Sequence, residues 1–257
     1  MTASPTPRHI AITGASSGLG AALALEYAGP GIRLSLHGRD TDRTEAVAAA
    51  ARSRGAEVDV ARFDVTDADA VAAWVTAIGA RAPLDLLIAN AGISGNETGS
   101  GGAVSAEVTR AIFAVNVDGV VNTVLPAAEL MLGRGRGAIA IVASLAGYRG
   151  QPGAPAYAAS KAAVKAWGEG LRPRLAHGGL RVSVVCPGFV RTPMTARNRF
   201  PMPFLMDADR AARIIRRGLD RNRARIAFPW QLAALCWLLA ALPAAWADRL
   251  LGSLPGK

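Results

Sequence analysis

Short apolar runs alternate with helix-forming segments along most of the chain. The apolar runs have the length of buried strands and lie at residues 9–13, 32–37, 58–63, 84–89, 138–143, 180–185 and 225–228. Helix-forming segments follow several of them, at residues 21–28, 41–53 and 67–81. This alternation predicts an α/β fold, in which a doubly wound parallel sheet of about seven strands lies between two helical layers.

A glycine-rich turn joins the first predicted strand to the first predicted helix. Gly14, Gly18 and Gly20 have the spacing Gly-x-x-x-Gly-x-Gly. In a strand–turn–helix unit, glycines let a pyrophosphate approach the backbone, and the N-terminus of the helix supplies free N–H groups. The turn therefore predicts a Rossmann-type dinucleotide site, and an ordinary glycine-rich turn is the alternative.

A tyrosine and a lysine are placed to act together. Tyr157 and Lys161 lie four residues apart and share one face if this stretch is helical, and Ser144 ends an apolar run upstream. A nearby cation lowers the pKa of a phenol, so the pair predicts a proton donor and acceptor tuned toward physiological pH. The spacing alone occurs by chance on many helices, and the other motifs give it weight.

Six motifs occur in register over residues 8–228: the turn from Thr13 to Gly20, Asn90-Ala91-Gly92, Asn116, Ser144, Tyr157-x-x-x-Lys161 and Pro187-Gly188. In this respect the chain resembles the short-chain dehydrogenase/reductase family. The resemblance implies that Tyr157 is the general acid/base and that Lys161 lowers its pKa and binds the nicotinamide ribose. It also implies that Ser144 binds the substrate oxygen and that Asn116 holds a water in a proton relay to Lys161.

The same resemblance implies a set of cofactor contacts. These are Gly14, Ser16, Ser17, Gly18, Leu19, Gly20, Asp64, Val65, Asn90, Ala91, Gly92, Tyr157, Lys161, Pro187, Gly188, Val190 and Thr192. Among them, Asp64 would bind the adenine amino group, and Val190 and Thr192 would bind the nicotinamide carboxamide. The chain departs from the family at Ala89, where a second asparagine is common.

The end of the second predicted strand bears on the choice of cofactor. An acidic residue there favours NAD(H), whereas this chain has Gly38 followed by Arg39. Because a guanidinium suits a 2′-phosphate, we expect NADP(H) to be preferred and keep NAD(H) as the alternative. Arg39 would then be a cofactor ligand rather than a solvent-facing side chain, and Asp40 would cap the next helix.

The amino-acid composition restricts the kinds of domain, partner and metal site that the chain can have. With 257 residues, 51% of them hydrophobic, the chain can form one domain with a full core, and its two cysteines are expected to be buried thiols. The net charge of +10 is not accompanied by a nucleic-acid fold signature, so we expect no nucleic-acid partner. The scattered histidines predict no metal site, and Glu97 is expected to be a solvated residue of a mobile loop at 95–102. The absence of a visible signal peptide predicts a cytoplasmic location, with the membrane surface as an alternative.

Two segments bear on substrate and partners. Residues 1–228 are expected to form one NAD(P)-binding domain, with an apolar lid at about 191–210 that favours a hydrophobic substrate. Residues 229–257 are an apolar C-terminal extension, preceded by a stretch rich in arginine. The extension predicts peripheral membrane contact, a subunit interface, packing on the chain's own pocket or, least favoured, a membrane span. By resemblance to the family, a homodimer or homotetramer is expected.

These observations predict an oxidoreductase that transfers a hydride between NADP(H) and a carbonyl or secondary alcohol of a hydrophobic substrate. A dinucleotide-sensing regulator without catalysis and a membrane-associated scaffold are the alternatives. The set of Ser144, Tyr157 and Lys161 favours the enzyme.

Overall fold

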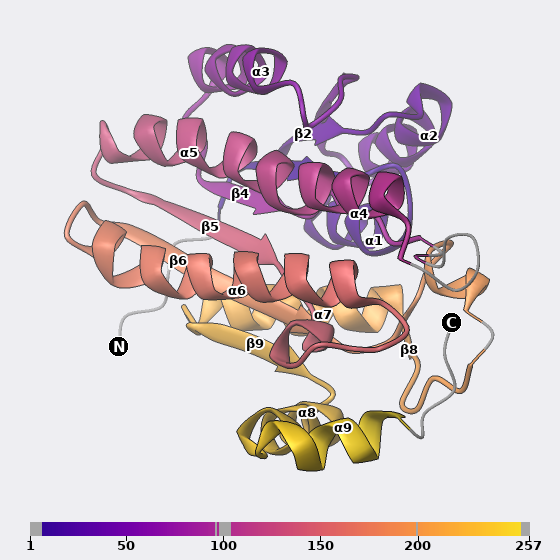
Figure 1. Ribbon diagram of the computed structural model, residues 1–257. Coiled ribbons are helices and arrows are strands. Elements are labelled where there is room, and N and C mark those ends of the chain that lie inside the picture. Colours follow the sequence, from indigo (N-terminus) through magenta and orange to yellow (C-terminus); the bar gives the residue numbers. More distant parts are fainter. Residues whose placement is uncertain (1–6, 96, 98–103, 199, 253–257) are drawn as a thin grey trace.

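The computed structural model describes residues 7–95, 97, 104–198 and 200–252, and its centre is one parallel sheet (Figure 1). The seven strands are β1 (His9–Thr13), β2 (Arg33–His37), β3 (Glu57–Ala61), β4 (Leu86–Ala89), β5 (Gly137–Val142), β6 (Leu180–Pro187) and β9 (Arg225–Phe228). They lie in the order β3-β2-β1-β4-β5-β6-β9, and every neighbouring pair is parallel. The predicted doubly wound α/β fold is confirmed, with strand boundaries within two residues of the predicted ones.

Helices cover both faces of this sheet. They are α1 (Gly18–Tyr27), α2 (Thr41–Arg52), α3 (Ala68–Arg81), α4 (Ala106–Phe113), α5 (Gly119–Leu132), α6 (Pro155–Ala176), α7 (Ala208–Asp220), α8 (Trp230–Ala241) and α9 (Ala244–Gly252). Helices α1, α2 and α7 pack on one face, while α3, α5 and α6 pack on the other. The three-layer arrangement follows from strands that are apolar on both sides.

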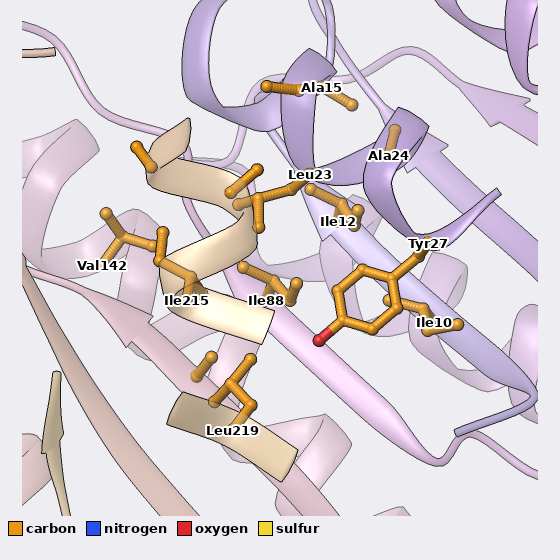
Figure 2. Packing of buried hydrophobic residues seen from close by; sticks show 14 of the residues in the cluster. Ile10, Ile12, Ala15, Leu23, Ala24, Tyr27, Ile88, Val142, Ile215 and Leu219 are labelled. Atoms are coloured by element: carbon orange, nitrogen blue, oxygen red, sulfur yellow. The ribbon is translucent and has the colours of Figure 1, made fainter. Parts of the chain in front are cut away.

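The core between α1, α7 and the sheet shows how the first βα unit is held (Figure 2). In the view of Figure 2, Ile12 of β1 lies beside Leu23 of α1 and Ile10 lies beside Tyr27, and both isoleucines are 0% exposed. Leu23 and Ile215 of α7 are also 0% exposed. Full burial of such a side chain contributes about 1.5–3 kcal/mol. The glycine-rich turn that joins β1 to α1 is therefore anchored at both ends by rigid packing.

Small elements complete the carboxyl edge of the sheet. A 3-10 turn, η3 (Leu145–Tyr148), follows β5, and a short parallel pair joins β7 (Val190–Arg191) to β8 (Met206–Asp207). The segment between them holds a second 3-10 turn, η4 (Thr195–Arg197). The predicted mobile loop at 95–102 lies largely outside the described residues.

The C-terminal extension does not form one spanning helix. Proline 243 separates α8 from α9, and the two helices lie beyond the β9 edge of the sheet (Figure 1). Among the described residues, one continuous helical stretch, 106–132, is long and apolar enough to cross a membrane, and it packs against the core through α5. Four of the upstream arginines, Arg210, Arg213, Arg216 and Arg217, belong to α7, whose other face is buried. Arg221 and Arg223 follow α7, and Arg225 begins β9.

Candidate active site

The glycine-rich turn has the close approaches that a phosphate-binding loop needs. Gly14 has a φ of +68°, and a Cβ placed on it would lie 2.9 Å from the Cα of Ala91. A Cβ on Gly20 would lie 2.1 Å from the carbonyl oxygen of Gly14. Ser17 stands at the N-cap of α1 without a side-chain cap hydrogen bond, so the N–H groups of the first turn are available to an anion. This cradle fits a dinucleotide pyrophosphate.

The loop after β4 holds this turn in place. The Asn90 side-chain amide donates to the carbonyl oxygens of Thr13 and Gly14 at 3.0 and 3.1 Å. The backbone N–H groups of Asn90 and Ala91 both donate to the Thr13 hydroxyl. Asn90 and Ala91 thus lie beside the loop as predicted, and Thr13 is a supporting residue that the sequence analysis did not select.

A cavity lies at the carboxyl ends of β2 and β3, apart from the glycine-rich turn. It has a volume of about 390 Å³ and is lined by Arg39, Arg62, Phe63 and Asp64. Hydrogen bonds from Thr66 to its carboxylate hold the pKa of Asp64 below its usual value. Two guanidiniums and one carboxylate therefore face the space where the adenosine end of a dinucleotide would lie. Arg62 was missed because residues 58–63 were expected to be strand.

Gly38 leaves no room for a side chain at the end of β2. A Cβ there would lie 2.2 Å from the Thr44 hydroxyl and 3.0 Å from the Cβ of Ser16. The Thr44 hydroxyl is itself fixed, because it donates to the carbonyl oxygen of Asp40 at 2.6 Å. Asp40 caps α2 by accepting from the N–H of Arg43 at 3.0 Å, as predicted. Val65, the last adenosine-side residue predicted, is 3% exposed.

The first turns of α6 bring the predicted catalytic side chains together. Ser144 begins η3, and its hydroxyl accepts from the N–H of Ala146 at 3.1 Å. The Tyr157 side chain is hydrogen-bonded to the side chain of Ser144. The Lys161 ammonium lies 5.9 Å from the centre of the Tyr157 ring and donates to the carbonyl oxygen of Val142 at 2.9 Å.

The electrostatics differ from the prediction that Lys161 lowers the pKa of Tyr157. Burial raises the pKa of Tyr157, and the hydrogen bond with Ser144 only partly opposes this. Burial also lowers the pKa of Lys161 to about 8. Desolvation is the largest cause of both pKa shifts, since both side chains are removed from water. At neutral pH the site therefore holds a neutral phenol, which is a proton donor.

Asn116 lies in a π-helical turn, η2 (Ala114–Asp118), between α4 and α5. Its side-chain oxygen accepts from the N–H of Ile93 at 2.8 Å, and its amide donates to Ile93 and to the Ser160 hydroxyl. A Cβ on Gly92 would lie 3.2 Å from the Asn116 oxygen and 3.3 Å from the Lys161 ammonium nitrogen. Asn116, Gly92 and Lys161 therefore lie close together. The water that Asn116 would hold in a proton relay to Lys161 stays a prediction.

The segment after β6 crosses back over the glycine-rich turn. Pro187 ends β6, and the N–H of Gly188 donates to the carbonyl oxygen of Phe228 at 2.7 Å. Val190 is buried, whereas Thr192 lies against the turn: a Cβ on Gly18 would be 2.9 Å from the Thr192 methyl carbon. The predicted nicotinamide-side residues are therefore brought to the same edge as the phosphate cradle. Leu19 faces the core beside this edge.

The prediction that Glu97 is a solvated loop residue is wrong. Glu97 is 4% exposed, and its carboxylate accepts from the backbone N–H groups of Ala156 and Tyr157. The histidines are structural as expected: His9 bonds Ser35, and His37 bonds the carbonyl oxygen of Phe63. Within the described part of the chain, no group of three or more metal-ligating side chains occurs.

Comparison with known proteins identifies the family to which this chain belongs. The family model for short chain dehydrogenases matches residues 8–201. An uncharacterized oxidoreductase of Myxococcus xanthus is 41% identical over 237 residues, which are 92% of this chain and 93% of the relative. A short-chain dehydrogenase from Sphingobium yanoikuyae in complex with NADPH superposes with a TM-score of 0.79 at 28% identity and covers 96% of both chains. One from Mycobacterium paratuberculosis bound to NAD has a TM-score of 0.75 at 25% identity and covers 86% of this chain and 94% of that one.

The order of the strands in the sheet agrees with these matches. The chain belongs to the short-chain dehydrogenase family and is an oxidoreductase that acts on CH–OH groups with NAD(P).

Proposed function

We propose that the protein reduces the carbonyl group of an apolar substrate with NADPH, through Ser144, Tyr157, Lys161 and Asn116. The observation that carries this proposal is the hydrogen bond between Ser144 and a Tyr157 phenol whose pKa is raised by burial. A phenol that stays protonated at neutral pH can give its proton to a carbonyl oxygen but is a poor base for alcohol oxidation. That difference supports the proposal that the protein works in the reductive direction.

In this mechanism each residue acts at a stated atom. NADPH supplies the hydride that adds to the carbonyl carbon. The Ser144 hydroxyl donates to the carbonyl oxygen and polarises it, and Tyr157 transfers its proton to that oxygen as the negative charge develops. Lys161 stabilises the phenolate that remains and binds the nicotinamide ribose. The phenolate then regains a proton by way of Lys161, and Asn116, fixed by Ile93 and Ser160, orients the water that replaces the proton on Lys161.

The preference for NADPH is supported by the cavity at the ends of β2 and β3. Arg39 and Arg62 line it, and both are exposed and able to turn toward a 2′-phosphate. The overlap at Gly38 also excludes the acidic side chain that would bind the two ribose hydroxyls of NADH. Asp64 remains available to the adenine amino group.

An apolar substrate is supported by the apolar residues of the segment that follows β7. Met194, Phe200 and Met202 lie half-buried between β7 and β8, and Phe200 packs edge-on against Phe189 at 5.9 Å. We propose that residues 191–210 form the lid over this substrate. Leu232 of α8 lies 2.9 Å from where a Cβ on Gly188 would be. We propose that the extension, which packs against this residue, forms part of the wall of the substrate site.

The outer side of the extension remains apolar. Trp230, Trp237 and Trp246 are 73%, 62% and 67% exposed, and α8 is apolar at every position except Gln231. Such a helix is ordinarily covered. We propose a second subunit of a homodimer or homotetramer as the cover, with a membrane surface as the alternative. Size measurement in solution and co-sedimentation with anionic vesicles separate the two, and the cytoplasmic location stays a prediction.

The test of the proposed reaction is NADPH oxidation, followed by absorbance, with a panel of apolar aliphatic and aromatic ketones. We expect turnover with the wild type and a large loss with Tyr157→Phe, which keeps the ring but removes the proton. A matched control is Tyr148→Phe, because Tyr148 lies on η3 outside the proposed proton path. Binding of NADPH without turnover of any ketone would instead favour the non-catalytic regulator.

A further inference from the structure

The catalytic helix α6 is capped by a residue from a distant part of the chain. Its N-cap residue, Ala154, has no side chain that can accept a hydrogen bond, and Pro155 occupies the first turn. The N–H groups of Ala156 and Tyr157 therefore have no acceptor within the helix. The Glu97 carboxylate accepts a hydrogen bond from each of these N–H groups. One of its oxygens lies 2.6 Å from the nitrogen of Ala156, and the other lies 3.1 Å from the nitrogen of Tyr157.

This contact is shielded from water. Glu97 is 4% exposed and Ala156 is 5% exposed, so the two hydrogen bonds are made in a place of low polarity. Charge-assisted bonds of this kind are about twice as strong as neutral ones, and the negative charge also meets the positive end of the helix dipole. Loss of the carboxylate would leave two buried donors without an acceptor.

Glu97 is itself fixed from the other side. Its carbonyl oxygen accepts from the N–H of Ser105 at 2.8 Å, and the Ser105 hydroxyl in turn caps α4 by accepting from the N–H of Val108. The carboxylate therefore connects the start of α4 to the start of α6. The second of its bonds is made to the backbone of Tyr157, the residue whose side chain meets Ser144.

We propose that Glu97 is a positioning residue for the reaction. It holds the first turn of α6 so that the Tyr157 hydroxyl stays within hydrogen-bond distance of Ser144, and it does not itself touch substrate or cofactor. The inference rests on the proposed function, because the position of Tyr157 matters only if Tyr157 transfers the proton. Displacement of a reacting group by about 1 Å can cost on the order of 100-fold in rate.

The test compares Glu97→Gln and Glu97→Ala with the wild type. The control is Asp67→Asn, because the Asp67 carboxylate also caps a helix, α3, at 3.0 Å from the N of Ala70, and belongs to a different helix from the catalytic residues. Three quantities are measured on the full chain: NADPH affinity, kcat and KM for an apolar ketone, and hydrogen–deuterium exchange of the amides in residues 154–161. A fourth is the rate ratio between NADPH and NADPH deuterated at the transferred position.

For Glu97→Ala we expect kcat to fall by about 10- to 100-fold with the affinity for NADPH within about twofold of wild type. The isotope ratio should rise, because hydride transfer becomes more rate-limiting, and exchange of residues 154–161 should be about tenfold faster or more. Glu97→Gln keeps one acceptor oxygen and should lie between Glu97→Ala and the wild type. Asp67→Asn should leave all four quantities unchanged.

Two results would overturn the inference. One is unchanged exchange in residues 154–161, which would mean that the carboxylate does not hold the helix. The other is a loss of kcat that matches the loss of folded protein while the isotope ratio stays constant, which would mean a stability role alone. If the wild type binds NADPH but reduces no ketone, the proposed function fails separately, and the exchange measurement still decides whether Glu97 clamps α6.

Discussion

The two arginines beside the adenosine cavity give a quantitative prediction about cofactor choice. Removal of Arg39 or Arg62 deletes a charged donor that can reach a 2′-phosphate but leaves the groups that meet the rest of the dinucleotide. A hydrogen bond to a charged group is worth about 1.5–3 kcal/mol, and solvent exposure of both side chains reduces this to about 1–2 kcal/mol. Each substitution to alanine should therefore weaken NADPH binding by about 5- to 30-fold.

NADH lacks the phosphate, so its affinity should change by less than about threefold in the same variants. The double variant should lose most of the NADPH preference, although the two effects need not add because the side chains share one cavity. Arg223→Ala is the control: it removes the same charge from an exposed position at the turn before β9. Any change that it causes reports long-range electrostatics rather than contact.

The assay is isothermal titration of each variant with NADPH, NADH and adenosine 2′,5′-bisphosphate at two salt concentrations. The bisphosphate isolates the half of the cofactor that the cavity would hold. The reasoning would be refuted if the wild type bound NADPH and NADH equally well. It would also be refuted if Arg39→Ala weakened both cofactors by the same factor, since the arginine would then not act through the phosphate.

Two further predictions follow from the geometry of the site. Gly38→Asp should lower the melting temperature and weaken the binding of both cofactors, because its Cβ would overlap the Thr44 hydroxyl. The double variant with Thr44→Ala should recover stability and bind NADH more tightly. Equal behaviour of the single and double variants in thermal shift would contradict this. Carbonyl reduction should be fast below pH 8 and fall as pH rises through about 8, because Lys161 loses its proton there while Tyr157, whose pKa is raised, keeps its own. A rate that stays flat through this range would exclude the Lys161 cation from the reaction.

Much of the fold was predictable because it depends on local patterns. Buried parallel strands are continuous apolar runs, and a strand–glycine–helix sequence determines the geometry of its turn. The order of the motifs then placed Ser144, Tyr157 and Lys161 at one edge of the sheet.

What the sequence could not provide depends on long-range contacts and burial. Glu97 lies 59 residues from Ala156, and no local pattern indicates that its carboxylate caps α6. The direction of the Tyr157 pKa shift was predicted wrongly because the i, i+4 spacing does not indicate how deeply the phenol is buried, and burial is the largest cause of the shift. Lys161 turns to the Val142 carbonyl, and that choice depends on the packing of α6 against β5.

The central claim is that Tyr157 protonates a carbonyl oxygen during hydride transfer from NADPH. Its most direct test is a single-turnover reaction of the NADPH complex with an apolar ketone that the wild type reduces, carried out with wild type and Tyr157→Phe. The account predicts equal NADPH affinity and a loss of hydride transfer of about 100-fold or more in the variant, since general acid catalysis contributes typically 10²–10⁴-fold. Hydride transfer at the wild-type rate in Tyr157→Phe would contradict the account.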